Sequence, residues 1–159
     1  QALAQWQVNL MAPMRMGRWL AQLHAGATSA QVSLIHILDQ KVFNLNPDYF
    51  SYTLSKLALH QAVALQAQAL APALRVNAVA PGLLYLSGPQ TDENFQAAGR
   101  VNLLREPINP EHVAQSVLFL AQNPGITGAS LPVDHGQHLV PMARDVMNIP
   151  LDTLKHFMP

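Results

Sequence analysis

A tyrosine and a lysine four residues apart are the residues of this sequence best suited to chemistry. They enclose the segment YTLSK, from Tyr52 to Lys56. On a helix, positions four apart lie on one face, so the phenol and the ammonium group can enter one site. A free tyrosine has a pKa of about 10, and a nearby positive charge lowers that pKa. Such a pair can donate a proton to a substrate atom while hydride arrives on the neighbouring atom.

The elements around this pair predict a parallel sheet with a site at its edge. Strands are predicted for three short apolar runs, residues 31–38, 75–80 and 129–133. Helices are predicted over residues 2–24, 49–70 and 109–122. Strands that alternate with helices favour an α/β fold with helical crossovers. Sites in such sheets form beyond the carboxyl ends of the strands, where Asp39, Tyr52 and Pro81-Gly82 are expected.

Local signals predict where the helices begin, bend and end. Pro13 is expected to bend or break the first helix, and Asp48 to cap the helix of residues 49–70. Asn109 followed by Pro110 is a strong helix start. Residues 83–105 are predicted to form a loop with one short helix, and residues 139–159 a tail without periodicity.

Composition narrows the class of protein. Half of the 159 residues are hydrophobic and 11% are charged, and nine basic residues balance nine acidic ones. We therefore expect no nucleic-acid partner, because such proteins carry a basic face. No stretch is apolar enough to predict a membrane span. The absence of cysteine fits a reducing compartment, and a cytoplasmic location is expected.

Five segments together resemble the C-terminal half of the short-chain dehydrogenase/reductase superfamily. They are VNLMAP with Asn9, YTLSK, RVNAVAPG ending at Gly82, NPEHVAQSVLFLA and TGASLPVDHG. The resemblance implies an NAD(P)-dependent oxidoreductase that acts on a small molecule. It identifies Tyr52 as the proton donor and Lys56 as the residue that binds the nicotinamide ribose and lowers the tyrosine pKa. It identifies Asn9 as the holder of a proton-relay water. The loop beside the nicotinamide is matched by Pro81, Gly82 and Leu83.

One position departs from the superfamily and suggests a substrate. The superfamily has a serine thirteen residues before its tyrosine, and this sequence has Asp39. An ionised aspartate would repel a developing oxyanion, whereas a protonated one can donate a hydrogen bond. Aspartate here resembles the pteridine reductases and the bacterial dihydromonapterin/dihydrofolate reductases of the superfamily. That resemblance implies reduction of a pterin- or folate-like C=N bond. The alternative role for Asp39 is a loop cap without chemistry.

The histidines suggest no metal site. Asp134-His135-Gly136 stands where the superfamily has aspartate–glycine–glycine, and a histidine at that turn is expected to alter the local backbone. His36 lies in a predicted strand and is expected to be a packed or hydrogen-bonded core residue. The other histidines are too scattered to predict a metal site.

No glycine-rich phosphate-binding loop occurs in the sequence. The first predicted strand also has an apolar edge that needs a partner. We therefore expect the C-terminal part of a Rossmann-type doubly wound sheet, with its N-terminal half missing. Residues 1–138 would form this part of a dinucleotide-binding domain, and residues 139–159 a tail that packs on a neighbouring subunit. The cofactor is expected to be NADP, with NAD possible because the discriminating segment is absent.

Two helices predict self-association. The helix of residues 49–70 is apolar around much of its circumference, and the helix of residues 2–24 has a similar excess. A helix that is apolar on several sides is buried on several sides. In the superfamily these helices build a subunit interface, so a homo-oligomer, most simply a tetramer, is expected. Two alternatives to a pterin reductase remain: a carbonyl or alcohol oxidoreductase, and a non-catalytic oligomerisation partner.

Overall fold

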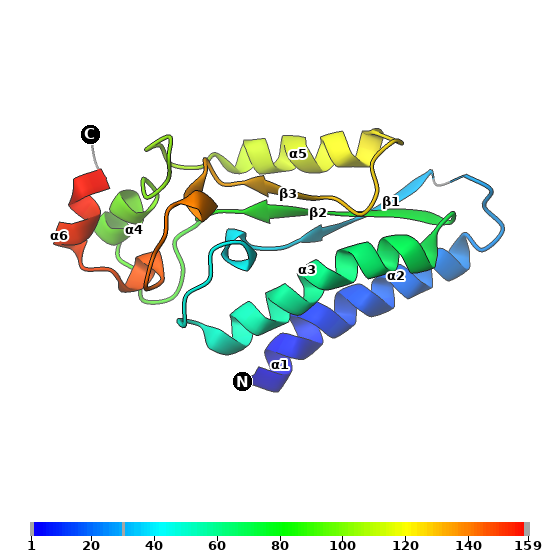
Figure 1. Cartoon of the computed structure of the whole chain (residues 1–159), viewed down its shortest axis with the longest axis horizontal. Coiled ribbons are helices and arrows are strands. Elements are labelled where there is room, and N and C mark those ends of the chain that lie inside the picture. The colour runs from blue at the N-terminus through cyan, green and yellow to red at the C-terminus, as the bar shows by residue number, and fades with distance from the viewer. Residues whose placement is uncertain (1, 30, 158–159) are drawn as a thin grey trace.

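A three-stranded parallel sheet forms the centre of the chain (Figure 1). The structure, a computed structural model, describes residues 2–29 and 31–157. The strands are β1 (Val32–Ile37), β2 (Leu74–Pro81) and β3 (Ser130–Val133), in the order β1-β2-β3. Every residue of β2 is buried, since this strand is paired on both sides and covered on both faces. The α/β fold and all three predicted strands are confirmed.

Helices cover both faces of the sheet (Figure 1). One face carries α1 (Ala2–Trp6), a π-helical turn (Gln7–Met11), α2 (Ala12–Leu23) and α3 (Phe50–Leu70). The other face carries α5 (Pro110–Gln122). The short helices α4 (Asp92–Ala98) and α6 (Leu151–Leu154) lie beyond the carboxyl ends of the strands. No helix among the described residues is long and apolar enough to cross a membrane.

The first helical segment is continuous but changes its hydrogen-bond pattern around Asn9. Pro13 has no N–H to donate to the carbonyl of Asn9, four residues earlier. Nearby, the N–H of Ala12 bonds to the Gln7 carbonyl, five residues earlier, as in a π-helix. The predicted break at Pro13 does not occur, since the helix continues through this residue, and a wide π-helical turn that contains Asn9 precedes it. Such turns inside α-helices are frequent at functional sites.

The predicted start of α5 is confirmed, and the predicted cap of α3 is wrong. Asn109 accepts a hydrogen bond from the N–H of Glu111 at 2.9 Å. At α3 the cap position is Tyr49, with a left-handed backbone (φ 54°) and no capping hydrogen bond from its side chain. The Asp48 carboxylate is instead occupied by the distant Arg144, so it does not serve the helix.

The C-terminal segment folds onto its own chain. Val146 and Leu154 are buried in a small core. Their partners there are Ala97 and Ala98 of α4 and Val101 of the turn that follows it. Short helical turns at 137–139, 146–148 and 155–157 complete the segment. Packing of this tail on a neighbouring subunit stays a prediction.

Two histidines occupy the positions expected from the sequence. His36 is 4% exposed, and its Nε2 atom lies 2.7 Å from the Gln66 amide oxygen, so the predicted hydrogen-bonded core role is confirmed. His135 adopts φ 51° and is followed by Gly136 at φ 78°. The turn therefore has two consecutive left-handed residues, one of which carries a side chain, and the expected change relative to a two-glycine turn stays a prediction.

Candidate active site

A cleft of about 530 Å³ opens at the carboxyl ends of the strands. Its walls come from the loop after β1, the start of α3, the loop after β2 and the C-terminal tail. Four of the residues predicted for the site line it: Asp39, Tyr52, Gly82 and Leu83. The sheet thus places them together as expected for an open α/β fold.

Tyr52 and Asp39 form the central contact of the cleft. The Tyr52 hydroxyl donates a hydrogen bond of 2.8 Å to one Asp39 carboxylate oxygen. The other oxygen accepts from the N–H of Lys41 at 2.9 Å and caps a helical turn (Gln40–Val42). Asp39 therefore caps the loop and also contacts the predicted proton donor, so the two roles do not exclude each other.

The electrostatics of Tyr52 differ from the prediction. Burial raises the pKa of the phenol, and the charge and hydrogen bond of Asp39 raise it further, with a smaller effect from the Asp145 charge. The predicted lowering of the Tyr52 pKa is therefore wrong for this arrangement, because burial and then the contact with Asp39 both act in the opposite direction. Tyr52 is consequently a neutral phenol over the ordinary pH range.

Lys56 lies beside Tyr52 as its helical spacing predicts. Its ammonium nitrogen is 5.8 Å from the Tyr52 ring centroid and donates to the Ile37 carbonyl at 2.8 Å. Burial lowers the pKa of Lys56, while the charge of Asp39 opposes this shift. An ammonium group has three N–H donors, and the Ile37 carbonyl takes one. The remaining donors suit the hydroxyl groups of a ribose, so this residue fits its expected role toward a nicotinamide cofactor.

Asn9 is connected to Tyr52 through one intermediate side chain. The Asn9 amide donates to the Ser55 hydroxyl at 3.0 Å, and that hydroxyl donates to the Tyr52 backbone carbonyl at 2.7 Å. Ser55 is fully buried. The structure therefore ties the π-helical turn to the first turn of α3, and the relay water held by Asn9 stays a prediction.

The turn after β2 is packed tightly against side chains from the segment before α5 and from the turn after β3. A Cβ atom on Gly82 would overlap the side chains of Gln137 and Ile108. The N–H of Leu83 donates to the side-chain oxygen of Gln137 at 3.1 Å. Gly82 is therefore required by close packing here, and the predicted contact of Pro81, Gly82 and Leu83 with a nicotinamide stays a prediction.

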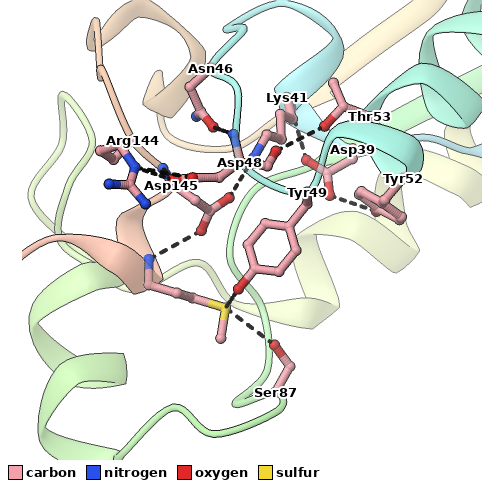
Figure 2. A network of polar contacts seen from close by, with 11 residues as sticks. Asp39, Lys41, Asn46, Asp48, Tyr49, Tyr52, Thr53, Ser87, Arg144 and Asp145 are labelled. Atoms are coloured by element: carbon pink, nitrogen blue, oxygen red, sulfur yellow. Dashed lines mark hydrogen bonds and ion pairs between the residues drawn. The ribbon is translucent and has the colours of Figure 1, made fainter. Parts of the chain in front are cut away.

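Several residues of the cleft were not predicted from the sequence. They are Lys41, Tyr49, Asp145 and Met147. Lys41 is 3% exposed, and its ammonium forms an ion pair with Asp145 at 2.7 Å (Figure 2). A lysine two residues after Asp39 is a weak signal, and the aperiodic tail gives none, so only the fold reveals this pair.

A second ion pair fastens the tail to the loop before α3. Arg144 Nε donates to both oxygens of Asp48, at 3.0 and 2.8 Å, and the N–H of Asp145 donates to one of them at 2.8 Å (Figure 2). These bonds hold the pKa of Asp48 well below its usual range, first through Arg144 and then through Asp145. The cleft thus has one wall made by residues almost a hundred positions away along the chain.

Known proteins resemble this chain in both sequence and structure. A family described as enoyl-(acyl carrier protein) reductase matches residues 1–138. A dihydromonapterin reductase of Escherichia coli is 30% identical over 133 residues, which cover 84% of this chain and 55% of that protein. FolM alternative dihydrofolate reductase 1 from Brucella canis, solved with NADP, superimposes with a TM-score of 0.80 at 35% identity. That match covers 89% of this chain and 56% of the other.

A third comparison extends the similarity. An apo SCOR enzyme from Clostridium thermocellum superimposes with a TM-score of 0.71 at 25% identity, over 89% of this chain and 55% of that one. The chain spans about half the length of the relatives it matches. The family match, the parallel sheet and the placement of Tyr52 and Lys56 agree with one another. The chain therefore belongs to the short-chain dehydrogenase/reductase superfamily, and its relatives include pteridine reductase-like members.

Proposed function

We propose that this protein reduces a pterin- or folate-like C=N bond with NADPH, with Tyr52 as the proton donor. The observation that carries the proposal is the 2.8 Å hydrogen bond between Tyr52 and Asp39 inside the cleft. An acidic group beside the phenol suits a basic ring nitrogen better than a carbonyl oxygen, which an ionised carboxylate would repel. The names of the E. coli and Brucella relatives support the same substrate class.

The proposed reaction assigns a separate task to each of the three side chains. A bound nicotinamide cofactor would supply hydride to the carbon of the C=N bond. Tyr52 gives its hydroxyl proton to the nitrogen, and Lys56 holds the ribose. The phenolate left on Tyr52 then regains a proton from solvent through the open cleft. The Asp39 carboxylate accepts the hydrogen bond of the restored hydroxyl, so it favours this return to the protonated phenol.

We include NADP, and not NAD, as the cofactor in this proposal. Two Brucella FolM structures that superimpose on the chain were solved with NADP. Lys56 offers free donors to a ribose common to NAD and NADP, so the chain's own residues support a nicotinamide cofactor without selecting between them. The cytoplasmic location expected from the sequence stays a prediction.

We also propose that the protein is a homo-oligomer. Large apolar side chains are exposed along one face of α1 and α2 and on α3. They are Leu3, Met16, Trp19, Phe50 and Leu65. Contact with a second copy would remove these surfaces from water, which is favourable in proportion to the apolar area buried.

A substrate screen tests the proposed reaction. The protein expressed from its complete gene is mixed with NADPH and, in parallel, with a dihydropterin, dihydrofolate and a simple diketone, and loss of NADPH is followed by absorbance. Turnover with the pterin or the folate is expected to exceed turnover with the diketone. Preference for the diketone would support a carbonyl reductase instead, and no turnover with any substrate would support the non-catalytic alternative.

A further inference from the structure

Two hydroxyl groups in the cleft share one weak acceptor. The Tyr49 hydroxyl lies 3.7 Å from the Met147 sulfur, and the Ser87 hydroxyl lies 3.6 Å from the same atom (Figure 2). All three residues line the cleft that contains Asp39 and Tyr52. A thioether sulfur is a weak hydrogen-bond acceptor. Both donors can therefore exchange it for an oxygen acceptor at little cost.

Several contacts hold Tyr49 in place although the residue is 46% exposed. Its backbone is left-handed (φ 54°), a conformation that bulky residues rarely adopt. The Lys41 ammonium lies 5.1 Å from its ring centroid. The preceding residue, Asp48, is tied to the tail through Arg144. Outliers of this kind cluster at ligand-binding positions, so the ring is already oriented before a ligand arrives.

The position of Tyr49 relative to the reacting groups fits a substrate contact. Tyr49 directly precedes α3 and Tyr52 lies in its first turn, and both side chains line the same cleft. A ligand whose ring contacts Tyr52 and Asp39 would extend a substituent along the cleft past Tyr49. Ser87 reaches the same sulfur from the loop after β2, on another wall.

The charged residues of the cleft determine which kind of substituent the Tyr49 and Ser87 hydroxyls can bind. Lys41 is the one cation among the described residues that line the cleft, and its ammonium is paired with Asp145. Burial and the charges of Asp145 and Asp48 raise the pKa of Tyr49, so the phenol remains a donor. Negative charges nearby disfavour a carboxylate. A neutral group with oxygen acceptors is therefore the better ligand.

We propose that Tyr49 and Ser87 form a second polar subsite, occupied by the Met147 sulfur until a substrate binds, that recognises hydroxyl groups on the side chain of a pterin. The inference rests on the proposed pterin reduction and makes it more specific. It favours a pterin with a short polyhydroxylated side chain over one that ends in a carboxylate.

Two dihydropterins test this subsite in the protein expressed from its complete gene. One carries a trihydroxypropyl side chain, and the other carries a methyl group in its place. Tyr49→Phe and Ser87→Ala should each raise KM for the hydroxylated pterin by about 3- to 10-fold, the scale of one neutral hydrogen bond. KM for the methyl pterin should change several-fold less, and kcat should fall less than KM rises.

Met147→Leu is the matched control, because it removes the sulfur and keeps the volume. It should not raise KM for the hydroxylated pterin, since the two donors then have no acceptor to give up. A rise equal to that of Tyr49→Phe would mean that the hydroxyls only position Met147, and it would overturn the subsite. Equal effects on both pterins, or none on either, would also overturn it. A wild-type protein that reduces neither pterin would instead overturn the proposed function.

Discussion

At the scale of single residues, Tyr52 lies between two groups of opposite charge. Its hydroxyl donates to Asp39 at 2.8 Å, whereas the Lys56 ammonium is 5.8 Å from its ring centroid. The closer partner is the carboxylate, and this contact favours the protonated phenol. A serine at residue 39 would remove both the charge and this acceptor geometry. The proposed chemistry therefore involves Asp39 as well as the tyrosine–lysine pair.

Removal of the phenol oxygen should abolish most of the activity. Tyr52→Phe preserves the packing of the ring and deletes the proton donor, and a loss of about 10²–10⁴-fold in kcat is expected for a general acid. Lys56→Ala should impair turnover and cofactor binding together. Steady-state kinetics measure both, with thermal unfolding as the control for folding. Near wild-type kcat in Tyr52→Phe would contradict the assigned role.

The ionisation of Tyr52 offers a test that needs no substrate. Free tyrosine ionises at a pKa of about 10, and burial together with Asp39 raises the pKa of Tyr52. The neutral phenol is therefore favoured in the folded state, and this contribution to stability is lost as pH rises above the ordinary tyrosine range. Phenolate absorbance compared with that of Tyr52→Phe should show late ionisation in the wild type and earlier ionisation in Asp39→Ser. Coincident titrations would show that Asp39 has no electrostatic effect on the phenol.

At the scale of elements, two ion pairs attach the tail to the loop before α3. The Lys41–Asp145 pair is largely buried, with side chains 3% and 17% exposed, whereas the Arg144 side chain of the other pair is 57% exposed. Breaking a buried pair leaves an uncompensated charge, whereas exposed pairs contribute little. The two pairs should therefore differ sharply in their effect on stability.

Lys41→Met should lower the free energy of unfolding by about 3 kcal/mol, because Asp145 is left without its cation. Arg144→Ala serves as the control and should have a much smaller effect. Chemical denaturation of both variants gives the comparison. Equal losses would show that burial does not distinguish the two pairs.

Local patterns predicted most of the elements, while long-range contacts could not be predicted. The strand of residues 75–80 and the start of α5 follow from hydrophobic pattern and capping, which depend on neighbours in sequence. Asp48 has the residue type of a cap, yet its partner Arg144 is 96 residues away and takes its carboxylate. The Lys41–Asp145 pair spans 104 residues. Which side chains form a pair depends on their distance in three dimensions, and their spacing in the sequence does not give that distance.

The candidate site could likewise be predicted only where local spacing determines it. Spacing on a helix predicted the proximity of Tyr52 and Lys56, and the sheet edge predicted the approach of Asp39. The predicted direction of the Tyr52 pKa shift was wrong because the shift depends first on how deeply the phenol is buried and then on its contact with Asp39. Met147 was missed because a tail without periodicity has no signal for the surface on which it packs. Tyr49 was missed because its partner Met147 is 98 residues away along the chain.

At the scale of the whole molecule, exposed apolar helices predict self-association. Trp19 on α2 is 57% exposed, and Leu65 on α3 is 63% exposed. Light scattering should show a tetramer, or at least a dimer, at micromolar concentration. Trp19→Glu should shift the mass toward smaller species, while Leu45→Glu, at a loop position that is 60% exposed, should not. A stable wild-type monomer would contradict this prediction.

The central claim is that Asp39 and Tyr52 act together on a pterin. The most direct measurement compares wild type and Asp39→Ser, in the protein expressed from its complete gene, with NADPH on a dihydropterin and on a simple diketone. Asp39→Ser should lower kcat/KM for the dihydropterin much more than for the diketone, because serine suits a carbonyl and the carboxyl suits a ring nitrogen. Equal changes on both substrates, or no change on either, would contradict the claim and leave Asp39 as a cap of its loop.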